Sequence, residues 1–311
     1  MKCKWIKKLT AGIIFLAAVG SLSGCQKAAT SENLFRDIEV NMTSVESAEE
    51  NQIVKLQMGD GDSAISQESN LDIEMTREPS AVHRKGQQKT NMAGTKETQE
   101  MESYQVEEDG KTVIYSGTDE AWEKNSVEEK DASSQQTLLF EGLQNLSGAF
   151  TVSQDLATVN KEECFELTGT ISGTQFQKTF ADTLKALLGE DSSDLSGWNL
   201  QASEEEDGNT ELQQKLNDVK VDCVIDVYRS NILPAKITFD LTDYLKAAGE
   251  ENAQVTSYTL EVTFVSYNDT KKIKVPKAVK ESAQDNGEDE AENNTDEMPE
   301  EENQEAAAEA E

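Results

Sequence analysis

Two Asp-Gly pairs constrain the fold of this chain most strongly, because each lies between runs in which every second residue is apolar. Both residues of an Asp-Gly pair tolerate the positive φ angles of a two-residue hairpin turn. The pairs are Asp60-Gly61, between residues 54–58 and 71–75, and Asp109-Gly110, between residues 104–106 and 112–115. Such alternation is typical of antiparallel strands that pack on one face and meet water on the other.

The same alternation returns near the end of the chain in residues 219–227, 235–241 and 258–264. The short connection Ser230–Pro234 requires the first two of these runs to be an antiparallel pair. Residues 165–171 indicate a further strand, and the polar stretch from Ser80 to Glu100 suits a long exposed hairpin.

Two stretches in the middle of the chain have helical rather than alternating spacing. One contains Leu139, Leu143, Leu146 and Phe150, and the other contains Phe176, Phe180, Leu184 and Leu187 before Gly189. The strands and helices do not alternate in the βαβ rhythm of a parallel sheet. We therefore predict the α+β class, in one domain from Asn51 to Lys280.

Residues 26–50 are predicted to be a polar tether followed by a first helix. Leu34, Ile38, Met42 and Val45 form a helical stripe, whereas residues 38, 40 and 42 alternate as in a strand. Both structures remain open from the pattern, and we favour the helix.

The first 25 residues have the features of an export signal. Lysines precede an apolar run, Leu9–Val19, that is shorter than the ~20 residues of a spanning helix. The run leads to Leu22-Ser23-Gly24-Cys25, which resembles the lipobox of bacterial lipoproteins. The resemblance implies cleavage before Cys25 and attachment to its thiol of a diacylglycerol, which carries acyl chains such as palmitate. An ordinary secretory signal, or an uncleaved anchor, is the alternative.

Charge is concentrated at the other end of the chain. The whole sequence has 61 acidic and 28 basic residues and a net charge of −33. Fourteen acidic residues and no Lys or Arg lie in residues 281–311, so we expect this tail to be disordered. Its alternatives are cation capture and docking of a basic partner. So acidic a chain is unsuited to nucleic acid, whose phosphates require Lys and Arg.

Two segments near the end resemble a known group of proteins. Residues 228–237 (Tyr-Arg-Ser-Asn-Ile-Leu-Pro-Ala-Lys-Ile) and residues 263–268 followed by 273–276 resemble the closing strands of LolA/LolB-like and LppX-like lipoproteins. This resemblance implies a strongly curved antiparallel β-sheet, a half-barrel, with helices covering its concave face. It also implies a cavity for acyl chains or lipidated proteins, without a catalytic motif.

From this resemblance we predict a membrane-anchored extracytoplasmic lipoprotein that binds a hydrophobic ligand, a lipid or acyl chain, and is not an enzyme. We expect it on the outer face of the cell membrane, held there by Cys25, and favour a Gram-positive surface. The candidate cavity residues are Phe176, Phe180, Leu184, Ile237, Phe239, Leu260 and Phe264. The alternative is an interaction protein with a filled core, which docks a basic envelope protein through its acidic surface or tail.

Other chemistry finds little support in the sequence. His83 is the only histidine, which excludes a histidine-rich metal site, and we expect it on the surface. We predict no metal and no cofactor. Cleavage removes Cys3 and the lipid occupies Cys25, so Cys164 and Cys223 are the cysteines left for a disulfide. Cys223 lies on the apolar face of its strand, whereas Cys164 lies on the polar face of its own strand. The pattern therefore disfavours this disulfide without excluding it, since a β-bulge would bring the two faces together.

Overall fold

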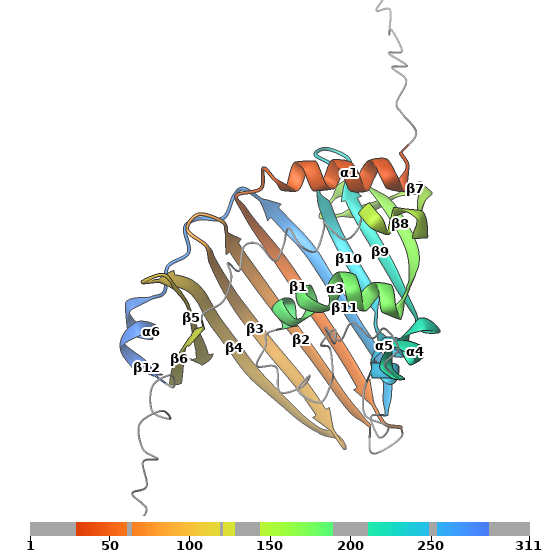
Figure 1. Cartoon of the computed structure of the whole chain (residues 1–311). Helices are drawn as coiled ribbons and strands as arrows, with labels where there is room; N and C mark the ends of the chain where they lie inside the picture. Colours follow the sequence, from red (N-terminus) through yellow and green to blue (C-terminus); the bar gives the residue numbers. More distant parts are fainter. Residues whose placement is uncertain are drawn as a thin grey trace, which may run out of the picture.

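The computed structural model describes residues 29–60, 64–118, 121–127, 144–188, 211–248 and 254–285. The strands in this part of the chain are β1 (Ser47–Met58), β2 (Ile65–Thr76), β3 (Ala81–Met92), β4 (Thr95–Glu108), β5 (Lys111–Thr118), β6 (Ala121–Val127), β7 (Phe150–Val159), β8 (Glu162–Ser172), β9 (Lys220–Tyr228), β10 (Pro234–Asp240), β11 (Val255–Tyr267) and β12 (Ala283–Asp285). They form one sheet in the order β12-β6-β5-β4-β3-β2-β1-β11-β10-β9-β8-β7. The sheet is strongly curved and open (Figure 1). The predicted α+β half-barrel is confirmed.

Most of the sheet consists of antiparallel neighbours joined by tight turns. The predicted turn between β4 and β5 places Asp109 and Gly110 at φ 53° and 78°, as expected for an Asp-Gly hairpin. The polar stretch from Ser80 to Glu100 is the long hairpin β3–β4, whose turn at Ala93-Gly94 also has positive φ. β1 and β2 pair without interruption, and residues 61–63 of their connection lie outside the described residues.

The closing strands β9, β10 and β11 also pair antiparallel, as the alternation predicts. One prediction for the middle of the chain is wrong. Phe150 does not end a helix but begins β7, directly after a short 3₁₀ turn, η2 (Ser147–Ala149). Its ring packs over Gly169 of β8, so burial against the sheet decides its conformation rather than helical spacing. Leu139 and Leu143 lie outside the described residues.

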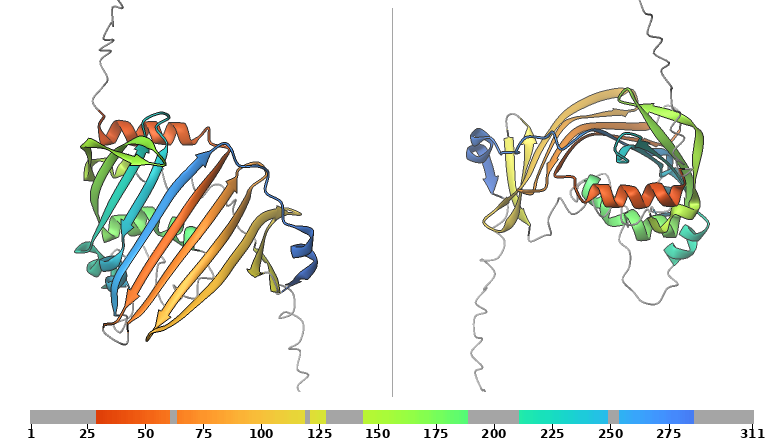
Figure 2. Two further views of the ribbon diagram at one scale, coloured as in Figure 1. Left: turned by 180° about the vertical axis from the view of Figure 1, so that it is seen from behind. Right: turned by 90° about the horizontal axis from the view of Figure 1, so that it is seen from above.

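Four helices accompany the half of the sheet that contains β7 to β11: α1 (Ser31–Met42), α3 (Gly173–Leu188), α4 (Glu211–Asn217) and α5 (Thr242–Ala248). The view from above shows α1 and α3 inside the curve of the sheet (Figure 2). The hydroxyl of Thr30 caps α1 by accepting the amide N–H of Asn33 at 3.3 Å. The helical reading of this region is confirmed, since Leu34, Ile38 and Met42 are buried against the core.

Pairing register assigns the two faces of the sheet. Val54 and Leu56 of β1 lie opposite Leu260 and Tyr258 of β11, and all four belong to the core beneath the helices. The helix-covered concave face is therefore the even-numbered face of β1 and β11. Carried across β2 and β3, the same register places Tyr104 of β4 on the opposite, convex face.

The convex face has its own cover, formed by the chain after β11. Ile273 and Val279, the latter in α6 (Lys277–Ser282), pack with Ala81, Tyr104, Val113, Tyr115 and Trp122. Lys280 pairs with Glu108 and lies over the ring of Tyr115. β12 then pairs in parallel with β6 and forms one edge of the sheet. We call residues 268–285 the C-terminal strap.

Both predicted domain boundaries shift. The domain begins before Asn51, because α1 is part of the core and β1 starts at Ser47. The predicted tail begins too early, because Glu281 and Ser282 belong to α6 and residues 283–285 form β12. The rest of the tail, residues 286–311, lies outside the described residues.

The close approach of β2 and β3 depends on a glycine in β3. A Cβ atom at Gly86 would lie 2.0 Å from the carbonyl oxygen of Asn70 on β2, far inside contact distance. We expect Gly86→Ala to lower the free energy of unfolding by about 1–3 kcal/mol, because the two backbones must separate. Urea denaturation followed by circular dichroism measures the change.

Gly148 provides the matched control. Nothing lies within 4 Å of a Cβ atom placed there. Gly148→Ala should therefore change stability by no more than about 0.5 kcal/mol. Equal effects of the two substitutions would contradict the close approach of β2 and β3.

Candidate functional site

Six of the seven predicted cavity residues meet on the concave side of the sheet. Phe176 and Phe180 come from α3, Ile237 and Phe239 from β10, and Leu260 and Phe264 from β11, and all belong to one apolar cluster. Their exposed fractions are 0–2%. The seventh, Leu184, lies in α3, and its side chain is outside the described residues. Periodicity and the family resemblance together therefore named residues that the fold gathers at one place.

Aromatic rings fill the centre of this cluster. The ring of Phe176 lies 5.3 Å from that of Phe180 and 5.5 Å from that of Phe239, and Phe180 and Phe239 are 5.2 Å apart. Tyr244 of α5, which the sequence reading missed, adds an edge contact to Phe176 at 5.0 Å. Burial raises the pKa of Tyr244 to about 12, so its hydroxyl stays protonated at neutral pH.

A second group of rings connects α1 to the edge of the sheet. Phe35 meets Phe150 edge to face, with centroids 5.1 Å apart at 90°. Gly169 makes this contact possible, since a Cβ atom there would lie 2.6 Å from the Phe150 ring. The helical stripe predicted from the sequence includes Leu34 and Ile38 but not Phe35, whose exposed fraction is 1%.

Toward β2 and β3 the concave face carries both apolar and polar side chains. Ile73, Met75 and Val82 form a small buried cluster there. Glu50 and Gln52 are 3% and 2% exposed, and Arg84 of β3 lies on the same face, where it donates to Gln105 at 3.4 Å. Burial lowers the pKa of Arg84, and the negative charge of Glu50 opposes that shift. A ligand lying along this face would meet apolar side chains under α3 and charged ones toward β3.

An open pocket of about 550 Å³ lies at the end of the covered half, between the start of α1, the start of β8 and the β9–β10 turn. None of the predicted cavity residues lines it. Its lining residues are Ala29, Asn33, Leu34, Arg36, Asp37, Glu162, Glu163, Phe165, Arg229, Ser230 and Ile232. Leu34 belongs to the concave cluster, and Ala29, Phe165 and Ile232 pack against it. The floor of the pocket is therefore continuous with the apolar core.

Charged side chains form the rim of this pocket. Arg229 pairs with Glu163 at 2.6 Å and lies 5.5 Å from the centre of the Phe165 ring. Arg36 donates two hydrogen bonds to Asp37, at 2.9 and 3.1 Å. The rim thus presents two guanidinium groups that already have orienting partners.

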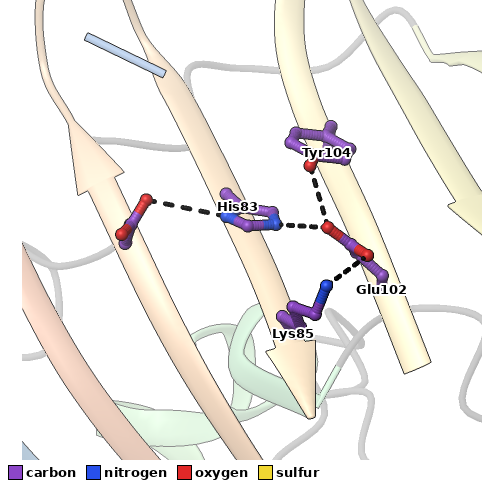
Figure 3. A network of polar contacts seen from close by, with 5 residues as sticks. His83, Lys85, Glu102 and Tyr104 are labelled. Atoms are coloured by element: carbon purple, nitrogen blue, oxygen red, sulfur yellow. Dashed lines mark hydrogen bonds and ion pairs between the residues drawn. The ribbon is translucent and has the colours of Figure 1, made fainter. Parts of the chain in front are cut away.

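A polar network lies on the convex face (Figure 3). The carboxylate of Glu102 accepts hydrogen bonds from Tyr104 at 2.8 Å and Lys85 at 3.0 Å, and it lies 2.9 Å from Nε2 of His83. The ring of His83 stacks on Tyr104 at 4.3 Å, and its Nδ1 is 3.6 Å from Glu74. Burial alone would raise the pKa of Glu102, but the hydrogen bonds outweigh it and lower the pKa below its usual range.

This network corrects the expectation for His83. Its side chain is 20% exposed, because Tyr104 covers one face of the ring. The contacts join β2, β3 and β4 beside the C-terminal strap, which indicates a structural role for this histidine.

Asp226 of β9 is a buried carboxylate on the convex face. It is 7% exposed, and its Oδ1 accepts no hydrogen bond from any described residue. Glu166 and Lys236 lie opposite it on the neighbouring strands. Burial raises the pKa of Asp226 to about 6, and the charge of Glu166 acts in the same direction.

The two cysteines of the domain are free and buried. Cys164 lies opposite Tyr228 on the convex side, and Cys223 lies in the concave cluster opposite Gly169. The disulfide considered from the sequence is not formed, since the two thiols lie on opposite faces of the sheet. Burial raises the pKa of Cys164 to about 11 and raises that of Cys223 as well. Cys25 lies outside the described residues.

Two further searches of the described residues gave negative results. No group of three or more His, Cys, Asp or Glu side chains among them is arranged to hold a metal ion. None of the helices in this part of the chain is both long and apolar enough to cross a membrane.

Comparison with protein families places the chain. A model described as "Family of unknown function (DUF6612)" matches residues 30–284, which is the whole of the domain from the cap of α1 to β12. The chain belongs to this family. The matched range begins at the cap of α1 and ends within β12. A search of curated proteins gives no match.

Solved structures with a similar arrangement include lipoprotein LppX of Mycobacterium tuberculosis, at 12% identity and a TM-score of 0.41 over 78% of this chain and 98% of that one. LprF of Mycobacterium bovis has 11% identity and a TM-score of 0.42 over 79% and 96%. A LolA superfamily protein of Nitrosomonas europaea has 10% identity and a TM-score of 0.21 over 81% and 97%. These structures come from the group that the closing strands resemble, and the fold itself follows from the strand order and curvature described above.

Asp226 gives a testable pH dependence. Because its pKa is raised in the folded state, the fold binds the proton more tightly than the unfolded chain does. Stability from this group is therefore greatest near pH 4 and falls as the pH rises through about 6. We expect Asp226→Asn to be more stable than the parent at pH 7.5 by on the order of 1–3 kcal/mol, with the difference vanishing near pH 4.

Urea unfolding at pH 4, 5, 6 and 7.5 measures this difference. Asp155→Asn is the control, because it removes a carboxylate that is exposed on β7. An Asp226→Asn effect that is the same at every pH would show that charge burial is not its cause.

Proposed function

We propose that this protein is a lipoprotein anchored by Cys25 to the outer face of the cell membrane, of the Gram-positive type. In this proposal it binds a hydrophobic ligand, an acyl chain or a lipid, between the curved sheet and helices α1 and α3. The role is binding and requires no catalytic step, metal or cofactor. The ligand would be held by burial of its apolar surface with few polar contacts.

The observation that carries this proposal is the continuity between the open pocket and the apolar core. Leu34 belongs to both, and Phe165 and Ile232 line the pocket while packing against the core. An acyl chain that enters at the pocket can therefore pass onto the concave face without crossing a polar layer. Its methylene groups would replace contacts now made between side chains, each buried group contributing about 0.8 kcal/mol.

A second candidate is supported by the packing of the core itself. The rings of Phe176, Phe180 and Phe239 fill the space between them at 5.2–5.5 Å, as expected for a filled core. In this alternative the protein binds a basic envelope partner through its acidic surface or tail. The two candidates differ in whether a ligand replaces the side-chain contacts of the concave face.

Recovery of the protein from its native membrane tests the first candidate. We expect mass spectrometry after solvent extraction to show a lipid in about stoichiometric amount, in addition to the lipid on Cys25. Phe180→Asp should remove it, because a carboxylate beside Phe239 is costly to bury next to an acyl chain. Val265→Asp is the control, since Val265 is 53% exposed and lies outside the core.

A second measurement uses the unsubstituted protein, because Phe180→Asp also loses lipid if it fails to fold. A fatty acid carrying a photoreactive diazirine is added to the unsubstituted protein, and labelled peptides are mapped. Labels on α3, β10 and β11 are expected. Labels distributed over exposed surfaces, together with a bare polypeptide mass, would exclude the carrier.

The partner alternative predicts binding that weakens with salt and depends on the acidic tail. The deletion should begin at residue 286, because Glu281 and Ser282 belong to α6 and residues 283–285 form β12. Removal of residues 286–311 should abolish binding to a basic partner measured by surface plasmon resonance. Unchanged binding would rule out the tail as the docking element.

A further inference from the structure

We propose that the 550 Å³ pocket at the start of α1 binds the headgroup of a zwitterionic phospholipid with a primary ammonium, phosphatidylethanolamine. This inference rests on the proposed function, because it assigns the ligand's polar end to the pocket and its acyl chains to the concave face. Position, charge and shape of the pocket support it separately.

Position comes first. Ala29 lines the pocket and is only four residues after Cys25, the predicted point of lipid attachment. Four residues of extended chain span at most about 14 Å. The pocket therefore lies within reach of the headgroup layer of the membrane that holds the anchor, which is roughly 5–8 Å thick on each side. Phospholipid headgroups are the molecules present at high concentration there.

Charge decides the kind of headgroup. Asp37 engages two nitrogen atoms of Arg36, and Glu163 engages one of Arg229. A guanidinium group carries five N–H donors, so both retain donors for a phosphate while their carboxylate partners hold them in place. The rim can thus bind an anion without reorganising its arginines.

Glu162 is the carboxylate that would accept a hydrogen bond from the ammonium group. Its carboxylate accepts the hydroxyl of Ser230 at 3.2 Å and forms no ion pair with a cation among the described residues. With two arginines and three carboxylates, the rim has one negative charge that lacks a counterion. A primary ammonium can donate to Glu162 while its phosphate accepts from Arg229, whereas the quaternary ammonium of phosphatidylcholine has no N–H to donate.

Shape orients such a ligand. Phe165, Leu34 and Ile232 form an apolar floor that leads into the concave cluster. The glycerol and upper acyl carbons would lie on this floor, below the charged rim. Arg229 is held over Phe165 by its cation–π contact, at the boundary between the polar and apolar parts.

Titration with short-chain lipids tests the inference. The mature chain from residue 25 to 311, with Cys25→Ser so that it carries no acyl group, is titrated with dihexanoyl phosphatidylethanolamine below its micelle concentration. The choline and glycerol headgroups with the same chains are titrated separately by calorimetry. We expect the ethanolamine lipid to bind about 10-fold more tightly than either, since one charge-assisted hydrogen bond distinguishes it.

Two substitutions separate the contacts. Glu162→Gln should remove the preference for ethanolamine over choline, with choline binding unchanged. Arg229→Gln should weaken binding of both lipids by about 10-fold, because both contain phosphate. Glu107→Gln, an exposed change of the same charge on β4, should alter neither. Thermal unfolding verifies that each variant is folded.

Several outcomes would overturn the inference: equal affinity for the three lipids, preference for the anionic glycerol headgroup, or no effect of Glu162→Gln. Loss of ethanolamine-lipid binding when Cys25 carries its lipid, measured in phosphatidylcholine nanodiscs, would assign the pocket to the protein's own acyl chains and would also overturn it.

The carrier role is tested separately by Phe180→Asp. If that variant loses its co-purifying lipid while Glu162→Gln changes nothing, the proposed function stands and the headgroup site fails. If the pocket selects among headgroups while the concave face holds no ligand, the headgroup site stands and the proposed function fails.

Discussion

Burial of the concave face is the interaction on which this structure depends. A single open sheet of twelve strands cannot bury its apolar side chains by itself, so it requires a second layer. Helices α1 and α3 provide that layer over one half, through fully buried side chains such as Phe35, Phe176 and Phe180. Each such side chain contributes roughly 1.5–3 kcal/mol relative to exposure. A ligand that enters this face competes with contacts that also hold the fold together.

The other half of the sheet is stabilised from outside. Toward β2 and β3 the concave face carries Arg84 beside a small buried cluster of Ile73, Met75 and Val82. On the convex side the C-terminal strap covers Tyr104, Tyr115 and Trp122. The network around Glu102 and His83 lies beside this cover, with three hydrogen-bonding groups on one carboxylate. The sheet is therefore packed on its inner side at one end and on its outer side at the other.

Alternation predicted most of the strands because one face of each is buried, and the period of two persists through β9, β10 and β11. The helix predicted through Phe150 is wrong because a helical stripe and the buried end of a strand can have the same spacing of apolar residues. The packing that decides between them is contact with Gly169 and Phe35, both distant in sequence. Six of the candidate residues named from the sequence lie together in the apolar core, whereas the pocket could not be predicted. Its rim joins Arg36, Glu162 and Arg229, and only the tertiary fold brings these polar residues together.

The first and the last described residues, 29 and 285, lie at opposite sides of the sheet. Ala29 lies near β8, close to one edge of the sheet, and residue 285 ends β12, the opposite edge (Figure 1). Eleven interstrand steps of about 4.8 Å separate these edges along the arc, a path on the order of 50 Å. The sheet therefore separates the first and the last described residues of the chain. With the proposed attachment at Cys25, the acidic sequence after residue 285 begins at the edge of the sheet opposite to β7.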